Sequence, residues 1–396
     1  MIKAVLFDLD HTLIETGRDT LSTCYFNALT AWFLTNNRNN LPYRVISDAL
    51  YQATFQTEEN HADPTRRNRD RISEYAAVLL GMSARNFEDA QATFHATSLA
   101  DKLRGVFSPS PGAVSLLSNL QARDIKVVLA CNALIPLDAM RQILELASLP
   151  KDYPFAFIPN ADEMHFSKPN ATFIEEILAR TGIEPDEALL VGDHLENDIG
   201  PAKDCGVRTF QVGVEGTLAD FSSKVSNGWL AKIGNQPATR YSIGQVIPRL
   251  LGNTAALYGM VDATPTTFWN QRPVVDSWTP LEIICHLRDA ERPVQRANLE
   301  LIVREDNPFL SQPNTLNPGQ IDYSGEDPRE VAAQFWAERR QTIHFLENLP
   351  AEAWSRPARH SIFGPTTLLE MALFIARHDR LHLNQLCQTV GRCKEE

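Results

Sequence analysis

Two aspartates separated by one residue follow an apolar run at the start of the chain. Asp8 and Asp10 come directly after residues 2–7, which have the continuous hydrophobic character of a buried parallel strand. In open α/β sheets, ligands bind just beyond the carboxyl ends of the strands. Two carboxylates at such a place are costly to bury unless a cation or a reaction uses them. We therefore expect a catalytic or cation-binding site here.

A second group of chemically capable residues lies in the last third of the chain. His378 and His382 are four residues apart, so in a helix they share one face, and the apolar residues around them indicate that this face is buried. His286 occupies a similar inward position in an earlier expected helix. Three protein ligands with an open position describe a catalytic-type transition-metal centre. A lone histidine on an apolar face is more often a core residue, but this trio predicts a metal site.

The elements that must position Asp8 and Asp10 alternate along the first part of the chain. Further strand-like segments at 126–130, 155–158, 188–191 and 209–212 are separated by helical patterns. This alternation predicts an α/β fold, a Rossmann-like doubly wound parallel sheet. Between the first strand and the second, residues of about 16–103 have only helical patterns.

Four short motifs in this region occur in a fixed order. They are Asp8-Leu9-Asp10-His11-Thr12, Cys131-Asn132, Lys168-Pro169, and Gly192-Asp193 followed by Asp198. Together they resemble the haloacid dehalogenase (HAD) superfamily, in which D-x-D-x-T carries phosphoryl transfer. The resemblance implies a hydrolase domain over residues 1–243, with a core of 1–15 and 104–243. The helical block of about 16–103 would be a cap that closes over the site and selects the substrate.

The resemblance also implies roles for these residues. Asp8 would be the nucleophile that forms an aspartyl-phosphate, and Asp10 the general acid and base. Asp8, the backbone carbonyl of Asp10 and Asp193 would hold Mg²⁺, while Asp198 would order this acidic metal site. Lys168 would neutralise the phosphate. Because dehalogenase members lack the second aspartate, Asp10 favours a phosphatase.

One motif departs from the family pattern. Cys131 stands where the family usually has Ser or Thr, beside Asn132, and the two are expected to bind the phosphoryl group. A thiol is a poor hydrogen-bond donor, so we expect weakened catalysis rather than none. In the cap, a cluster of arginines could hold an anionic substrate, although a solvated helix face is the preferred interpretation; these are Arg66, Arg67, Arg69 and Arg71.

After residue 243 the sequence predicts helices and no strands. The expected spans are about 248–262, 280–304, 328–348 and 368–390, and several begin with an N-cap residue three positions before Glu or Gln. Lysine also nearly disappears, with Lys394 alone beyond position 245. We therefore expect a separate all-α four-helix bundle over residues 244–396.

The bundle resembles the DinB-like (YfiT-like) helical family. The resemblance rests on residues 276–282, 285–291 and 378–385. It implies that His286, His378 and His382 bind Zn²⁺ or Ni²⁺, and that the domain is a thiol-dependent transferase or a hydrolase.

Polar and aromatic residues lie near the three histidines in the sequence. Glu291 and Asp379 are candidate hydrogen-bond partners for ligating imidazoles. Cys285 and Cys387 could join the metal site, although small core residues are the preferred interpretation. Trp278 is expected to cover the end of the bundle, with stacking on a cofactor as the alternative.

Composition limits the remaining functions. The formal net charge of −12 argues against a general nucleic-acid binder. The six cysteines are scattered without a C-x-x-C pair, which fits a reducing compartment. Without a signal peptide or an apolar run of membrane-spanning length, we expect a cytoplasmic protein, possibly a homodimer.

Three functions stay open at this point. The first is a Mg²⁺-dependent hydrolase of small phosphomonoesters fused to a three-histidine metal-binding bundle. The second is a Zn²⁺- or Ni²⁺-dependent hydrolase or thiol transferase centred on the bundle, with the HAD-like part auxiliary. The third is a non-catalytic binding protein in which both sites are degenerate, for which Cys131 is the main argument.

Overall fold

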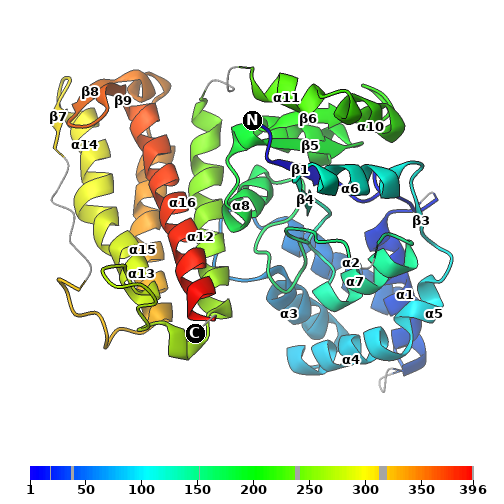
Figure 1. Cartoon of the computed structure of the whole chain (residues 1–396). Helices are drawn as coiled ribbons and strands as arrows, with labels where there is room; N and C mark the ends of the chain where they lie inside the picture. Colours follow the sequence, from blue (N-terminus) through cyan, green and yellow to red (C-terminus); the bar gives the residue numbers. More distant parts are fainter. Residues whose placement is uncertain (18, 37–39, 151, 237–240, 312–318, 395–396) are drawn as a thin grey trace. The chain divides into compact units, whose positions relative to one another are not determined.

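A computed structural model describes residues 1–17, 19–36, 40–150, 152–236, 241–311 and 319–394. The chain divides into two compact units, with the division between residues 239 and 240. Helices and short strands of both units are labelled in Figure 1. Among the described residues, no helix is both long enough and apolar enough to cross a membrane.

A parallel sheet lies at the centre of the first unit. Phe7, at the end of its first strand, pairs with Leu129 on one side and Val191 on the other, so three strands end at the same edge. The strand order is β4-β1-β5-β6 and every pairing is parallel. The predicted α/β fold with a parallel sheet is confirmed. The strands are β1 (Ala4–Phe7), β4 (Lys126–Leu129), β5 (Ala188–Gly192) and β6 (Arg208–Gln211).

The strand expected at residues 155–158 is wrong. Phe157 makes only an isolated bridge with Val128, although two backbone hydrogen bonds connect this segment to β4. Pro154 and Pro159 flank the segment and have no N–H group to donate to a ladder. The segment therefore runs beside β4 as a loop.

Helices alternate with these strands and bury the sheet. Phe221 on α10 contacts Phe7 edge-to-face, with 5.9 Å between the ring centroids, and it also contacts Phe210 of β6. All four residues of β1 are fully buried. The helices of this part are α6 (Ala113–Ala122), α7 (Leu137–Leu146), α8 (Ala171–Thr181), α9 (Gly200–Asp204), α10 (Leu218–Ser226) and α11 (Trp229–Gly234).

The helical block between β1 and β4 forms as the sequence predicts. Its two connections to the sheet lie side by side, because β2 (Ile14–Glu15) pairs antiparallel with β3 (Ser108–Pro109). This short ribbon joins the cap to the sheet (Figure 1). The cap helices are α1 (Leu21–Asn36), α2 (Tyr43–Glu58), α3 (Asn68–Leu80), α4 (Ala84–Thr97) and α5 (Leu99–Leu103).

The second unit is a helical bundle, as predicted. Thr279 and Thr367 cap their helices through the backbone N–H groups of Glu282 and Glu370, so the sequence signals for helix starts are confirmed. The helix expected over 280–304 contains a π-helical segment at Glu291–Arg296. The helices are α12 (Val246–Ala263), α13 (Pro280–Ala290), α14 (Ala297–Arg304), α15 (Pro328–Glu347) and α16 (Leu368–Cys393).

The expectation that this unit contains no strands is wrong. A small sheet with the order β7-β8-β9 accompanies the bundle. Its strands are short, and Gly364 at the start of β9 has a φ of 72°, which suits a tight turn because glycine has no Cβ to clash. Such short segments carry little periodicity to detect. The strands are β7 (Phe309–Leu310), β8 (Pro357–His360) and β9 (Gly364–Thr367).

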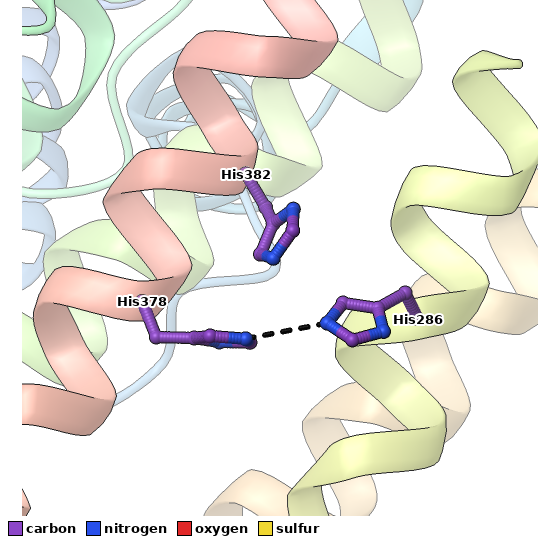
Figure 2. A group of neighbouring side chains, drawn as sticks. All are labelled: His286, His378 and His382. Carbon is purple, nitrogen blue, oxygen red and sulfur yellow. Dashed lines mark hydrogen bonds between the residues drawn. The ribbon is translucent and has the colours of Figure 1, made fainter. Parts of the chain in front are cut away.

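Helices α13 and α16 bring the three candidate metal ligands together. His286 extends from α13 toward His378 and His382 on α16, and the three imidazole rings face a common centre (Figure 2). His286 and His378 are 92 residues apart along the chain and come together because α13 packs against α16.

Candidate active site and candidate metal centre

A buried lysine connects two carboxylates at the end of the parallel sheet. Lys168 Nζ donates a hydrogen bond to Asp8 Oδ1 at 2.5 Å and also to Asp198 Oδ1. Asp8 follows β1, Asp198 lies in the π-helical turn after β5, and all three residues are buried. Strands β1 and β5 pair and end at the same edge, which brings Asp8 and Asp198 together, and the loop before α8 adds Lys168 to the cluster.

The acidic side chains form a set that suits a hard cation. Asp8, Asp193 and Asp198 each offer a carboxylate oxygen, and these oxygens lie within 4.8 Å of one another. Oxygen-only donor sets of this kind fit Mg²⁺. Asp10 lines the same cavity, but its carboxylate accepts a hydrogen bond from the backbone N–H of Leu21, the first residue of α1, at 2.8 Å.

The charges of this cluster are unbalanced. Burial raises the pKa of Asp8, which the nearby Lys168 ammonium opposes. Burial also raises the pKa of Asp10, and burial together with Asp198 raises that of Asp193. The two carboxylates beside Lys168 raise its pKa in spite of its burial. One ammonium thus faces several carboxylates, an arrangement that a divalent cation would relieve.

The loop that carries Lys168 is fixed from α8. Glu176 is fully buried and accepts hydrogen bonds from the backbone N–H groups of His165 and Phe166 and from the His165 ring. Burial alone would raise the pKa of Glu176, but His165 and Arg180 hold it below its ordinary value. Glu176 therefore anchors the residues that come directly before Lys168.

Gly192 is required by close packing in the Gly192-Asp193 motif. A Cβ added at this position would lie 2.7 Å from Asp198 Cγ, a distance that real side chains do not tolerate. Asp198 Oδ2 also accepts the backbone N–H of His194 at 3.0 Å. The glycine thus lets Asp198 reach back over the end of β5 toward Lys168.

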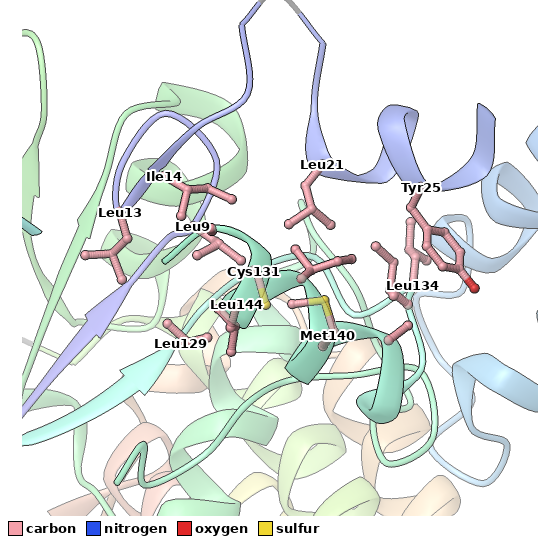
Figure 3. Close-up of a cluster of buried hydrophobic side chains, with 14 of the residues drawn as sticks. Leu9, Leu13, Ile14, Leu21, Tyr25, Leu129, Cys131, Leu134, Met140 and Leu144 are labelled. Atoms are coloured by element: carbon pink, nitrogen blue, oxygen red, sulfur yellow. The ribbon is translucent and has the colours of Figure 1, made fainter. Parts of the chain in front are cut away.

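The structure places Cys131 differently from the sequence-based expectation. Cys131 is buried in a hydrophobic cluster with Leu129, Leu134 and Met140 (Figure 3). Its Sγ lies 3.6 Å from the carbonyl oxygen of Pro159, to which the thiol donates. Burial raises the pKa of Cys131 to about 12, so the thiol stays protonated. Among the described residues, Asn132 lines the cavity beside Asp8 and Lys168, and Cys131 does not.

A cavity of about 450 Å³ opens beside the cluster. Asp8, Asp10 and Lys168 line one part of it, and α1 and α2 of the cap line another. Asn132 Nδ2 donates to Glu58 Oε1 of α2 at 2.8 Å. Glu58 was missed in the sequence, because it stands at the end of a helix beside Glu59 and belongs to no motif.

The cap arginines bind carboxylates of the protein itself. Arg66 pairs with Glu74, Arg67 with Asp70, Arg69 with both Glu88 and Asp162, and Arg71 with Asp63. None of the four lines the cavity beside Lys168. The preferred interpretation as a solvated face also fails for Arg71, which is buried.

The three histidines of the bundle form a compact centre. One ligand nitrogen from each lies within 4.8 Å of the others, and the Nε2 atoms of His286 and His378 are 3.2 Å apart. Burial and the neighbouring imidazoles lower the pKa of His286 to about 3 and that of His378 to about 4. Burial lowers the pKa of His382 as well. All three rings are therefore neutral at neutral pH, the form that coordinates metals.

Two side chains position His382. Gln385 Oε1 lies 2.9 Å from Nδ1, which leaves Nε2 for a ligand role. Trp278 stacks on the His382 ring, with the planes 4° apart and the centroids 5.6 Å apart. The described metal-capable group contains neither cysteine. Cys285 is buried, as the preferred interpretation expects, whereas Cys387 is exposed and is not a core residue.

The carboxylates expected beside the histidines have another partner. Arg339 is fully buried, and its guanidinium donates to both Glu291 and Asp379. Thr342 also donates to Glu291. The expectation that Glu291 and Asp379 orient the imidazoles is therefore wrong: an arginine, which stays charged when buried, needs both carboxylates.

Comparison with known families agrees with both units. Residues 2–206 match the haloacid dehalogenase-like hydrolase family, and residues 249–386 match the DinB superfamily. The chain belongs to the haloacid dehalogenase-like hydrolases and carries a DinB-like bundle after the hydrolase domain. The resemblances drawn from the motifs, and the prediction of a HAD-type hydrolase, are confirmed.

Curated relatives of the first part of the chain are phosphatases. A glyceraldehyde 3-phosphate phosphatase of Methanothermobacter thermautotrophicus is 24% identical over 230 residues, which are 58% of this chain and 93% of the relative. A phosphoglycolate phosphatase of Rhodospirillum rubrum is 29% identical over 220 residues, 52% of this chain and 78% of the relative.

Two solved structures are similar to the separate parts. A HAD phosphatase from Thermococcus onnurineus has a TM-score of 0.38 and 18% identity, with 57% of this chain and 98% of that chain covered. YfiT from Bacillus subtilis, described as a "probable metal-dependent hydrolase" with a four-helix bundle, has a TM-score of 0.33 and 18% identity, with 39% and 93% covered.

Proposed function

We propose that the first domain hydrolyses small phosphomonoesters with the help of Mg²⁺. The observation that carries this proposal is the bridge from Lys168 to Asp8 and Asp198 beside a cavity that Asp10 also lines. A nucleophilic carboxylate, a second carboxyl group two residues away and a fixed cation are what phosphoryl transfer through a covalent intermediate requires.

In the first half of the reaction, a carboxylate oxygen of Asp8 attacks the phosphorus. The ester P–O bond breaks, and its electron pair leaves with the alcohol oxygen, which takes a proton from the Asp10 carboxyl group. The raised pKa of Asp10 favours a protonated acid before this step. The Lys168 ammonium offsets the negative charge of the phosphoryl oxygens.

In the second half, Asp10 accepts a proton from a water molecule. The oxygen of that water attacks the phosphorus, the bond to Asp8 breaks, and inorganic phosphate leaves with Asp8 restored. Asp8, Asp193 and Asp198 form the donor set that would hold Mg²⁺, which supplies further positive charge beside the phosphoryl group when bound.

The family membership and the relatives support this proposal over a binding protein with degenerate sites. The two curated relatives described above are named as phosphatases of glyceraldehyde 3-phosphate and of phosphoglycolate, both small phosphomonoesters. Cys131, the main argument for degeneracy, donates to Pro159 and is packed in the core, so its replacement of a hydroxyl leaves the acidic cluster and Lys168 intact.

The direct test is phosphate release from a panel of phosphomonoesters with Mg²⁺. Asp8→Asn should lower kcat/KM by at least about a thousandfold, because the amide is not a nucleophile. Asp89→Asn, a matched change on the exposed face of α4, should keep wild-type activity. EDTA should abolish release, and added Mg²⁺ should restore it. Undiminished release by Asp8→Asn would overturn the proposal.

We propose that the second domain comprises residues 244–396. In this domain we infer a Zn²⁺ or Ni²⁺ ion bound by His286, His378 and His382. The supporting observation is three neutral, converging imidazoles. Three protein ligands leave a position for water or a substrate thiol, so hydrolase or thiol-transferase chemistry is the second candidate function. A full-length protein that binds no Zn²⁺ or Ni²⁺ would contradict it.

A further inference from the structure

The cap side of the active-site cavity has a particular chemical character. Its described lining residues are hydroxyl, amide and aromatic side chains from α1 and α2, together with one charged group, the Glu58 carboxylate. Neutral groups of this kind include Thr23, Asn27, Tyr51 and Thr54. A substrate whose phosphoryl group sits at Asp8 would place the rest of its structure against these side chains.

Glu58 is fixed at the boundary between the cap and the catalytic cluster. It accepts a hydrogen bond from Asn132 Nδ2 at 2.8 Å, and Asn132 Oδ1 accepts one from the backbone N–H of Lys168 at 3.3 Å. A chain of two hydrogen bonds therefore connects the cap carboxylate to the residue that would hold the phosphoryl group. Glu58 cannot move away from the substrate without breaking this connection.

The cavity offers no second strong cation among its described lining residues. Lys168 is held by two carboxylates and would be used by the phosphoryl group. The first two arginines after Glu58 in the cap sequence, Arg66 and Arg67, pair with Glu74 and Asp70 instead. A carboxylate on the substrate would thus meet Glu58 without a compensating charge, and like charges in a partly buried site repel strongly.

We propose that Glu58 makes this enzyme select phosphomonoesters whose leaving group carries uncharged or cationic hydrogen-bond donors and reject those whose leaving group carries a carboxylate. This inference rests on the proposed phosphatase function and narrows its substrate class. The Glu58 carboxylate and the neighbouring hydroxyl groups accept hydrogen bonds from hydroxyl or ammonium groups of the leaving alcohol. Between the activities of the two relatives described above, this favours that on glyceraldehyde 3-phosphate over that on phosphoglycolate.

The test compares two substrates that differ in one group. Glyceraldehyde 3-phosphate carries an aldehyde where 3-phosphoglycerate carries a carboxylate. At pH 8, chosen because burial raises the pKa of Glu58, the wild-type kcat/KM should favour the aldehyde by at least about tenfold. Two further substrates are assayed separately: phosphoethanolamine, whose leaving group carries an ammonium donor, and glycerol 3-phosphate, whose leaving group carries hydroxyl donors.

Two variants and one control test whether charge in the cavity causes the selectivity. Glu58→Gln keeps an acceptor for Asn132 but removes the charge, so it should reduce the preference by about tenfold, mainly through a lower KM for 3-phosphoglycerate. Glu59→Gln removes the same charge from an exposed neighbour that does not line the cavity and should leave the preference unchanged. Asn27→Lys adds a cation at an exposed position of the cavity wall and should improve 3-phosphoglycerate hydrolysis.

The outcomes separate this inference from the proposed function. Wild-type enzyme that hydrolyses 3-phosphoglycerate as well as the aldehyde overturns the role of Glu58 while leaving the phosphatase intact. An unchanged preference in both Glu58→Gln and Asn27→Lys does the same. Phosphate release that survives Asp8→Asn overturns the phosphatase itself, and the inference with it.

Discussion

The Lys168 ammonium lies 2.5 Å from the Asp8 carboxylate although the two residues are 160 positions apart. Their contact is buried, and Lys168 also binds Asp198. This relationship ties the loop before α8 to the end of β1. We therefore expect the stability of the first domain to depend on the charge balance of this cluster.

Replacing Lys168 should reveal that dependence. In Lys168→Met with EDTA, Asp8 and Asp198 lose their common cation, and the free energy of unfolding should fall by about 3–5 kcal/mol. Added Mg²⁺ should stabilise this variant more than the wild type, because the metal replaces the missing charge. Urea unfolding with and without Mg²⁺ measures both effects. Lys203→Met, at an exposed position of α9, is the control, and equal stability of the two variants would contradict the prediction.

Cys131→Ser should change activity little. The thiol donates to the carbonyl of Pro159 and is packed among apolar side chains, so a serine hydroxyl would take over that hydrogen bond instead of binding the phosphoryl group. We expect kcat/KM within about threefold of the wild type and a stability loss of about 1 kcal/mol for burying the more polar group. Steady-state kinetics would show a gain of tenfold or more if the hydroxyl reached the substrate.

Metal content should depend on the three histidines and on Gln385. His382→Ala should lose Zn²⁺ or Ni²⁺ after dialysis, and Gln385→Leu should bind about 10–100-fold more weakly, since Gln385 orients the His382 ring. Elemental analysis and metal titration of the full-length protein test this. His344→Ala, at an exposed position of α15, should retain the metal. Equal metal content in His382→Ala and His344→Ala would exclude the proposed site.

The buried Arg339 should be essential for the stability of the bundle. Arg339→Leu leaves Glu291 and Asp379 buried without their cation, so the free energy of unfolding should fall by about 3–5 kcal/mol. Arg340→Leu, at the exposed next position, should cost little. Combining Arg339→Leu with Glu291→Gln and Asp379→Asn should recover part of the loss, because no unpaired charge remains. Denaturant unfolding of the four proteins would refute this if Arg339→Leu and Arg340→Leu were equally stable.

Local signals in the sequence predicted the helices of the bundle well. Thr279 and Thr367 start their helices because each side chain bonds a backbone N–H three residues later, an interaction within one turn. The short strands β7, β8 and β9 were missed because segments of two to four residues carry too little periodicity to detect, even though β8 and β9 pair locally. Residues 155–158 have the composition of a strand but make only an isolated bridge, because Pro154 and Pro159 flank them and cannot donate to a ladder.

The sequence by itself determined which residues could do chemistry, since the spacing of Asp8, Asp10 and the later motifs reflects strand ends that any parallel sheet brings to one edge. Tertiary structure alone decided what surrounds them. Glu58 accepts a hydrogen bond from Asn132, 74 positions away in the sequence. Arg339 donates to Glu291 and Asp379, the carboxylates expected to bind the histidines. Such pairings follow from which buried charges lie within reach of one another, and side-chain packing between distant elements sets that distance.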